Sequence, residues 1–200
     1  MSAIYKRSIR EKIDESILQL ASEFIGNGAF FFFNEADVKC RLYSIIKSNL
    51  EDPELVHSEW GEDYPRGRYD LVIWRPTKKN KALDCWGHDH KTIMKMVPDL
   101  LLASVEIDCL YGGDKKANQF TTYAKLMRNP DIIKLKKNIG YKFAYGYFLL
   151  LWDDEAIETY SNIVGKISTA CRKLFKNDRI SSIGISREKQ NILFKHGFVV

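Results

Sequence analysis

Three acidic side chains stand out in two apolar segments of the sequence. Asp70 directly precedes the run LVIW (71–74), and the segment VEID places Glu106 and Asp108 at alternate positions. Residues two apart on a β-strand point to the same face of the sheet, so Glu106 and Asp108 are expected side by side. Pairing of their strand with the strand of Asp70 would bring three carboxylates together. Such carboxylates repel unless a cation lies among them, and oxygen ligands suit magnesium or manganese.

Hydrophobic periodicity predicts the elements that position these acids. Apolar residues recur at helical spacing from Ser8 to Ile25 and again after Asn34, and the continuous apolar run at 141–153 predicts a strand buried on both faces. In chain order we expect helices at 8–25 and 34–50, strands at 55–60, 68–74 and 101–111, a helix at 117–127, a strand at 141–153, a helix at 154–175 and a strand at 180–186. This order predicts an α/β fold with a mixed central sheet of about five strands and helices on both faces.

Length and composition fit one globular domain. The chain has 200 residues, of which 45% are hydrophobic and 28% charged, so we expect a single domain over 1–200 with an N-terminal helical extension at 1–28. The longest apolar runs are shorter than the roughly 20 residues that cross a bilayer. The first residues are charged and resemble no secretory signal, which predicts a cytoplasmic protein without a membrane partner. The four cysteines are widely spaced and are expected to be reduced.

The order of the acidic motifs resembles the PD-(D/E)XK nuclease superfamily, to which many restriction endonucleases belong. The resemblance covers about residues 30–150: a helix with Glu35, the strand GRYDLVIW, the strand ASVEID and a following helix. It implies a restriction-endonuclease-like fold in which Asp70 and Glu106, with the backbone carbonyl of Ile107, bind Mg²⁺ or Mn²⁺. It also implies that Asp108 binds metal or accepts a proton from the attacking water, and that Glu35 orients this water or a second cation.

A second match follows the strand ASVEID. The segment QFTTY resembles the Q-x-x-x-Y signature of the exonuclease branch, and residues four apart share one face of a helix. A basic stretch over 125–142 comes next, with one acid, Asp131. Residues expected to contact the DNA backbone are Lys115, Lys116, Gln119, Tyr123, Lys125 and Arg128. The alternative is that the basic stretch is a solvated helical face.

One residue departs from the pattern of the superfamily. The third motif position is usually a lysine, which places a positive charge near the scissile phosphate, whereas this chain has Asp108. Lys115 or Lys116, just beyond the strand, could supply that charge. The departure also leaves a second hypothesis open, in which the fold has lost cleavage and serves as a DNA-binding or assembly module.

Other interpretations of these acids need no metal. Asp70 could close a turn with Arg66 or Arg68, and Glu106 and Asp108 could face solvent on a half-exposed strand. The group Cys85, His88, Asp89 and His90 has spacing that could hold a transition metal, but it has no second ligand cluster and fits a polar loop better. Pro98-Asp99 fits a turn before a strand, and Glu59 is a weak additional ligand.

The leading hypothesis is therefore a magnesium-dependent deoxyribonuclease that hydrolyses phosphodiester bonds in DNA. A homodimer would suit the cutting of both strands. A protein with a purely structural role remains a third alternative, in which the acids are incidental. Three alternatives stay open at this point: whether the substrate is DNA or RNA, whether cleavage is by an endonuclease or an exonuclease, and which sequence is recognised.

Overall fold

The fold is taken from a computed structural model of the chain. It describes residues 3–26, 35–61, 68–76, 101–111, 114–139, 143–153, 161–186 and 190–200. The histidine and cysteine group at 85–90 and the turn at 98–99 lie outside the described residues, as do the aromatic residues 30–33.

The described residues form one six-stranded sheet in which neighbours in space are neighbours in sequence. The strands are β1 (Val56–Gly61), β2 (Arg68–Trp74), β3 (Leu101–Tyr111), β4 (Tyr145–Asp153), β5 (Ile180–Ser186) and β6 (Asn191–His196). Strands β1, β2 and β3 pair antiparallel, β3, β4 and β5 pair parallel, and β6 is antiparallel to β5. The predicted mixed sheet is confirmed, with one more strand than expected.

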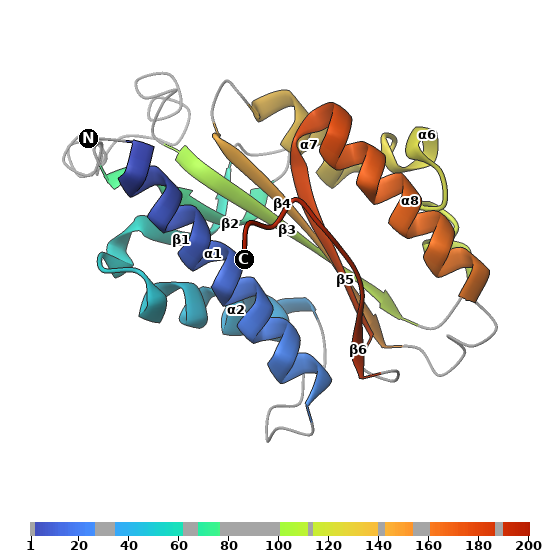
Figure 1. Cartoon of the computed structure of the whole chain (residues 1–200), viewed down its shortest axis with the longest axis horizontal. Coiled ribbons are helices and arrows are strands. Elements are labelled where there is room, and N and C mark those ends of the chain that lie inside the picture. Colours follow the sequence, from blue (N-terminus) through green and yellow to red (C-terminus); the bar gives the residue numbers. More distant parts are fainter. Residues whose placement is uncertain are drawn as a thin grey trace.

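Helices cover both faces of the sheet. Figure 1 shows α1 (Ala3–Ile25) and α8 (Ser161–Asp178) on opposite sides of the strands, with α2 (Glu35–Asn49) beside α1. The remaining helical segments are η1 (Pro53–Leu55), α5 (Asp114–Ala117), α6 (Tyr123–Leu126) and α7 (Pro130–Asn138). No helix of the described residues is both long enough and apolar enough to cross a membrane.

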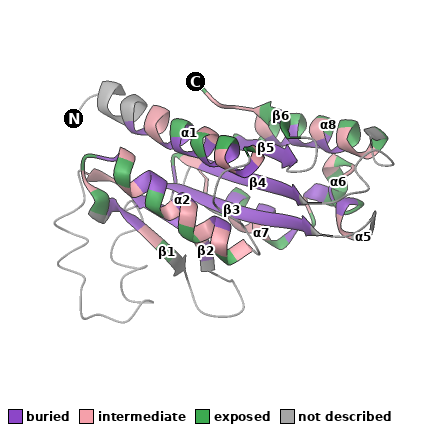
Figure 2. Ribbon diagram, turned by 90° about the horizontal axis from the view of Figure 1, so that it is seen from below, coloured by how far each residue is buried: buried purple, intermediate pink, exposed green. Residues whose placement is uncertain are grey.

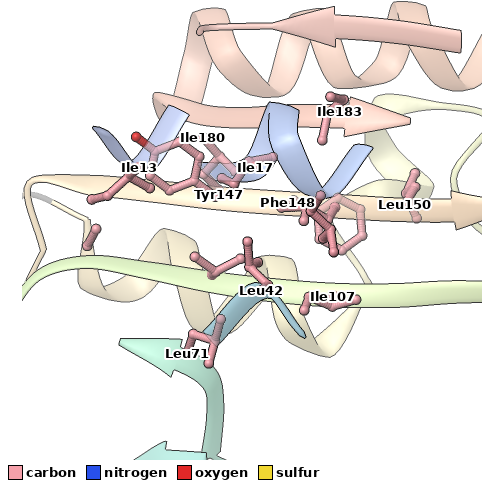
Figure 3. Packing of buried hydrophobic residues seen from close by; sticks show 14 of the residues in the cluster. Ile13, Ile17, Leu42, Leu71, Ile107, Tyr147, Phe148, Leu150, Ile180 and Ile183 are labelled. Atoms are coloured by element: carbon pink, nitrogen blue, oxygen red, sulfur yellow. The ribbon is translucent and has the colours of Figure 1, made fainter. Parts of the chain in front are cut away.

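The core lies between the sheet and these helices. Ile13 and Ile17 of α1 pack near Tyr147 of β4, and Leu42 of α2 lies near Ile107 of β3 (Figure 3). All five side chains are at most 2% exposed. The N-terminal helix therefore contributes side chains to the main core. Strands β3 and β4 are buried along most of their length (Figure 2), as the continuous apolar run of β4 predicted.

The helix expected at 117–127 is wrong as a single element. The chain forms α5, then a turn, and starts again at α6, because the side chain of Thr122 accepts a hydrogen bond from the backbone N–H of Lys125 and caps a new helix. Gln119 lies in the turn and Tyr123 begins α6, so the two do not share a helical face. Helix α7 was foreseen only in the alternative of a helical face within 125–142, and strand β6 was not expected.

Candidate active site

Asp70 lies where β2 separates from β3. The last paired residues at this end are Leu71 and Val105, and continuing their register places Asp70 opposite Glu106. Asp70 is therefore a neighbour of Glu106, and its charge contributes to the raised pKa of Glu106. The backbone N–H of Ile107 donates to Asp70 Oδ2 at 2.8 Å. The Asp70 side chain thus binds β3 at the position where the ladder with β2 has ended.

Glu106 and Asp108 lie on the same face of β3. In the parallel register with β4, Glu106 is level with Phe148 and Asp108 with Leu150. Glu106 is 1% exposed and Asp108 is 6% exposed. The alternative that both acids face solvent is therefore wrong. Two buried carboxylates on one face of a strand need positively charged or hydrogen-bonding partners.

A lysine from a different helix approaches each of the three acids. Lys39 Nζ of α2 lies 3.3 Å from Asp70 Oδ1, Lys134 Nζ of α7 lies 2.8 Å from Glu106 Oε1, and Lys116 Nζ of α5 lies 2.6 Å from Asp108 Oδ1. Lys116 Nζ also donates to the carbonyl oxygen of Cys109 at 2.8 Å. The Lys134 ammonium group is the counter-charge of the buried Glu106 Oε1. The cluster therefore alternates negative and positive charge.

Burial is the main cause of the electrostatic behaviour of these acids. It raises the pKa of Glu106 well above its ordinary value; Lys134 acts against this shift, and the charge of Asp70 adds to it. Burial also raises the pKa of Asp70 and Asp108, although the Ile107 N–H and Lys116, respectively, oppose it most strongly. The carboxylates of the folded site therefore bind protons more readily than carboxylates in water do.

Glu35 joins the cluster from the first turn of α2. It is half-buried, and burial followed by the charges of Asp70 and Asp108 raises its pKa. The point where β2 leaves β3 therefore brings together four acids from three elements: Glu35 from α2, Asp70 from β2, and Glu106 and Asp108 from β3. The four catalytic candidates of the sequence are close enough to influence one another's titration.

The two lysines on the β3 side remain charged. For Lys116, burial lowers the pKa, but the hydrogen bond to Asp108 and its charge outweigh this and raise it. For Lys134, the effect of burial is likewise outweighed by Glu106 and by Asp131, whose Oδ1 lies 3.3 Å from Lys134 Nζ. Positive charge is thus fixed beside the carboxylates at neutral pH.

The residues expected to contact DNA are spread over a wider surface. Gln119, Lys125 and Arg128 are exposed and line a cavity of about 410 Å³ beside α6. Tyr123 lines a different cavity and donates its hydroxyl to Asp178 Oδ2 at 2.5 Å. The side chains of Lys115 and Glu59 lie outside the described residues.

Two residues of the cluster escaped the sequence-based prediction of the site. Lys39 lies four residues after Glu35 and so shares its helical face, which is a usable signal. Lys134 belongs to the basic stretch at 125–142, which the sequence suggests for contact with the phosphate backbone, but its side chain is only 12% exposed and contacts Glu106. Its position depends on where α7 docks, which was not predicted.

Among the described residues, no three His, Cys, Asp or Glu side chains are grouped so that they could hold a metal ion together. Two opposed carboxylates still fit magnesium, which commonly takes one or two carboxylates and completes its shell with water. Asp70 and Glu106 are the pair with this placement, whereas Asp108 is held by Lys116. Comparison with protein-family models, with curated proteins and with solved structures found no match.

Proposed function

We propose that this chain is a metal-dependent nuclease with a restriction-endonuclease-like fold that hydrolyses phosphodiester bonds in DNA. The observation that carries the proposal is the placement of Asp70 opposite Glu106 at the point where β2 leaves β3. Glu35, Asp70 and Glu106 also lie on a helix and two strands in the order that the resemblance implies. Their shared position beside the end of the β2–β3 ladder supports a common role for these acids.

The metal would be held by Asp70 and Glu106. The fit depends on the chemistry of the donors, because Asp70 and Glu106 are neighbouring carboxylates that supply oxygen ligands, with Lys134 as the present counter-charge of Glu106 Oε1. A bound Mg²⁺ or Mn²⁺ would polarise the phosphate and lower the pKa of a bound water. Glu35, whose pKa is influenced by the charges of Asp70 and Asp108, would orient that water.

Lys116 is the candidate for the positive charge that the superfamily usually supplies from the lysine at the third motif position, which is Asp108 here. Lys116 comes from α5, beyond β3, yet its ammonium group contacts Asp108, the residue that stands where the superfamily usually has lysine. Asp108 would then be a positioning residue that holds Lys116 toward the site. Fixed positive charge of this kind stabilises the negative charge that develops on a phosphate during cleavage.

The second candidate function is a DNA-binding or assembly module that no longer cuts. The observation in its favour is that a lysine already neutralises each of Asp70, Glu106 and Asp108. In such a module the ion pairs would be structural. Added magnesium would then leave the thermal midpoint of the protein unchanged and the DNA uncut.

The deciding experiment is cleavage of supercoiled plasmid and of labelled linear, single-stranded and branched DNA with Mg²⁺, Mn²⁺ or chelator. We expect metal-dependent cutting by the wild type and a loss of at least about 100-fold in Asp70→Asn and Glu106→Gln, because each removes a charged ligand. Glu51→Gln is the matched control, since Glu51 is exposed and pairs with Lys12 away from the cluster. Undiminished cutting by Asp70→Asn would refute the assignment, and absence of cutting by the wild type would favour the module.

A further inference from the structure

We propose that the groove between α6 and α8 binds the phosphate backbone of a single nucleic-acid strand. The groove is a site apart from the carboxylate cluster, because none of the four acids or their lysines lines it. It has a volume of about 370 Å³ and is bounded by the start of α6 and by one face of α8. The inference depends on the charge, the shape and the aromatic side chain of this groove.

The charge of the groove is purely positive among the described residues. Lys166 and Lys173 line it, and the lining includes no acid. The two lysines are seven residues apart on α8, which is two turns or roughly 10 Å along the axis. They can therefore meet two different phosphates of one backbone. Thr122 also lines the groove; its hydroxyl oxygen accepts from the Lys125 N–H, which leaves its proton to donate to a phosphate oxygen.

Gly165 exposes helix backbone in the lining of the groove. It lies inside α8, where glycine destabilises a helix relative to alanine. A Cβ atom built at Gly165 meets nothing within 4 Å, so the packing of the described residues gives no reason for glycine there. Gly165 is exposed and lines the groove. A ligand that approaches the helix backbone closely would explain a glycine at this position.

Tyr123 supplies a fixed aromatic side chain at the edge of the groove. Its hydroxyl donates to Asp178 Oδ2, while Lys136 Nζ lies 3.0 Å from Asp178 Oδ1 and holds the carboxylate from the other side. Asp178 is largely buried, with a side chain 5% exposed. A tyrosine held in this way can stack on a base without ordering its own side chain first. Bases stacked on Tyr123 with phosphates at Lys166 and Lys173 describe a single strand rather than a free phosphate.

The first test uses Gly165→Ala. Binding of fluorescein-labelled oligo(dT) is followed by fluorescence anisotropy in chelator, so that no cleavage intervenes. We expect a higher thermal midpoint, because alanine favours the helix, together with affinity lowered about fivefold or more by the added methyl group in the groove. A higher thermal midpoint with an unchanged affinity for oligo(dT) would overturn the proposal. Misfolding cannot explain the expected result, because the variant is the more stable protein.

The second test removes the charges of the groove. The double variant Lys166→Gln, Lys173→Gln is compared with Lys176→Gln, which changes an exposed lysine of the same helix that does not line the groove. We expect the double variant to reduce the slope of log affinity against log salt by about 1.4, since each phosphate contact with a single strand contributes about 0.7. The proposal would be overturned if Lys176→Gln reduced the salt slope by as much as each lysine of the double variant does. It would also be overturned if inorganic tripolyphosphate, added at the same total charge, displaced the labelled strand as well as unlabelled oligo(dT) does.

The two proposals fail separately. If the protein does not cut DNA with any metal but binds oligo(dT) through the groove, the groove proposal stands and the nuclease proposal fails. If the protein cuts DNA, and neither cutting nor binding changes in Gly165→Ala and in the double lysine variant, the nuclease proposal stands and the groove proposal fails.

Discussion

At the scale of single residues, the main feature of this protein is the pairing of buried acids with lysines from three different helices. Lys39, Lys116 and Lys134 come from α2, α5 and α7, yet each contacts a carboxylate of the same cluster on β2 and β3. Ion pairs that are removed from water cost much of what they gain, so they are poor devices for stability alone. Their convergence is better explained by a site that needs fixed charges of both signs.

Lys116 allows this explanation to be tested. If its ammonium group stabilises charge on the phosphate, Lys116→Gln should lower kcat for cleavage by about 100-fold while changing the affinity for DNA only a few-fold. The measurement is single-turnover cleavage beside binding in chelator. Lys125→Gln is the matched control, because Lys125 is exposed and lines the cavity beside α6; it should weaken binding and leave kcat unchanged. Equal rates for Lys116→Gln and the wild type would assign Lys116 a structural role.

The sequence predicted the acids of the site better than the lysines. Alternation within VEID is a local property, and it placed Glu106 and Asp108 on one face without knowledge of the fold. Asp70 could be added because hairpin-like pairing is the usual relation of successive strands. Lys134 depends on where α7 docks, which is a tertiary property, and its charge pointed instead to a role on the surface.

At the scale of elements, the errors have local physical causes. Helix α7 has nine residues and begins with Asn129 as its cap and Pro130 in its first turn, a clear start signal that the lysine-rich composition obscured. Strand β6 is an edge strand in which only Phe194 is buried, so it lacks the alternation that reveals a strand. The long elements α1, α2, β3 and β4 were predictable because their apolar periodicity extends over many residues.

Strand β4, helix α1 and the C-terminal segment meet at one buried acid. Asp14 of α1 is fully buried, accepts a hydrogen bond from the Tyr147 hydroxyl at 2.8 Å and accepts another from the backbone N–H of Val199 at 2.7 Å. Burial raises the pKa of Asp14 despite these two donors. One carboxylate thus joins three segments that are far apart in the chain.

We predict that Tyr147→Phe lowers the free energy of unfolding by about 1–3 kcal/mol, because Asp14 Oδ1 loses its donor while it stays buried. Chemical denaturation monitored by circular dichroism measures this change. The control is Tyr43→Phe, since Tyr43 is half-buried and its hydroxyl accepts from the nearby Lys47 at 3.2 Å. A loss no larger than that of the control would mean that Asp14 is satisfied in another way.

At the scale of the whole molecule, the buried acids give the fold a characteristic dependence on pH. Asp14, Glu35, Asp70, Glu106 and Asp108 all have raised pKa values with burial as the first cause. A raised pKa means that the folded state binds the proton more tightly than the unfolded chain does. Stability from these groups is therefore fully present below their ordinary values near 4 and is lost as pH rises through the raised values. His196, whose pKa burial lowers, acts in the opposite direction.

Comparison of Glu106→Gln with the wild type isolates one acid and cancels the effect of His196. In chelator, the thermal midpoint of the variant relative to the wild type should increase from pH 5 to pH 8, because only the wild type must ionise a buried carboxylate as pH rises. Differential scanning calorimetry at several pH values measures both midpoints.

Magnesium should reverse this relation at pH 8. A cation bound by Asp70 and Glu106 stabilises the ionised carboxylates, so the wild type should gain about 2.7 kcal/mol at a concentration of 100 times Kd. The same addition should have a much smaller effect at pH 5, where protons compete for the carboxylates, and in Glu106→Gln, where one ligand is neutral. Glu51→Gln should respond as the wild type does, because Glu51 is exposed on another surface. Equal stabilisation of the wild type and Glu106→Gln would place the magnesium elsewhere, and no stabilisation of either would leave the lysines as the counterions of the cluster.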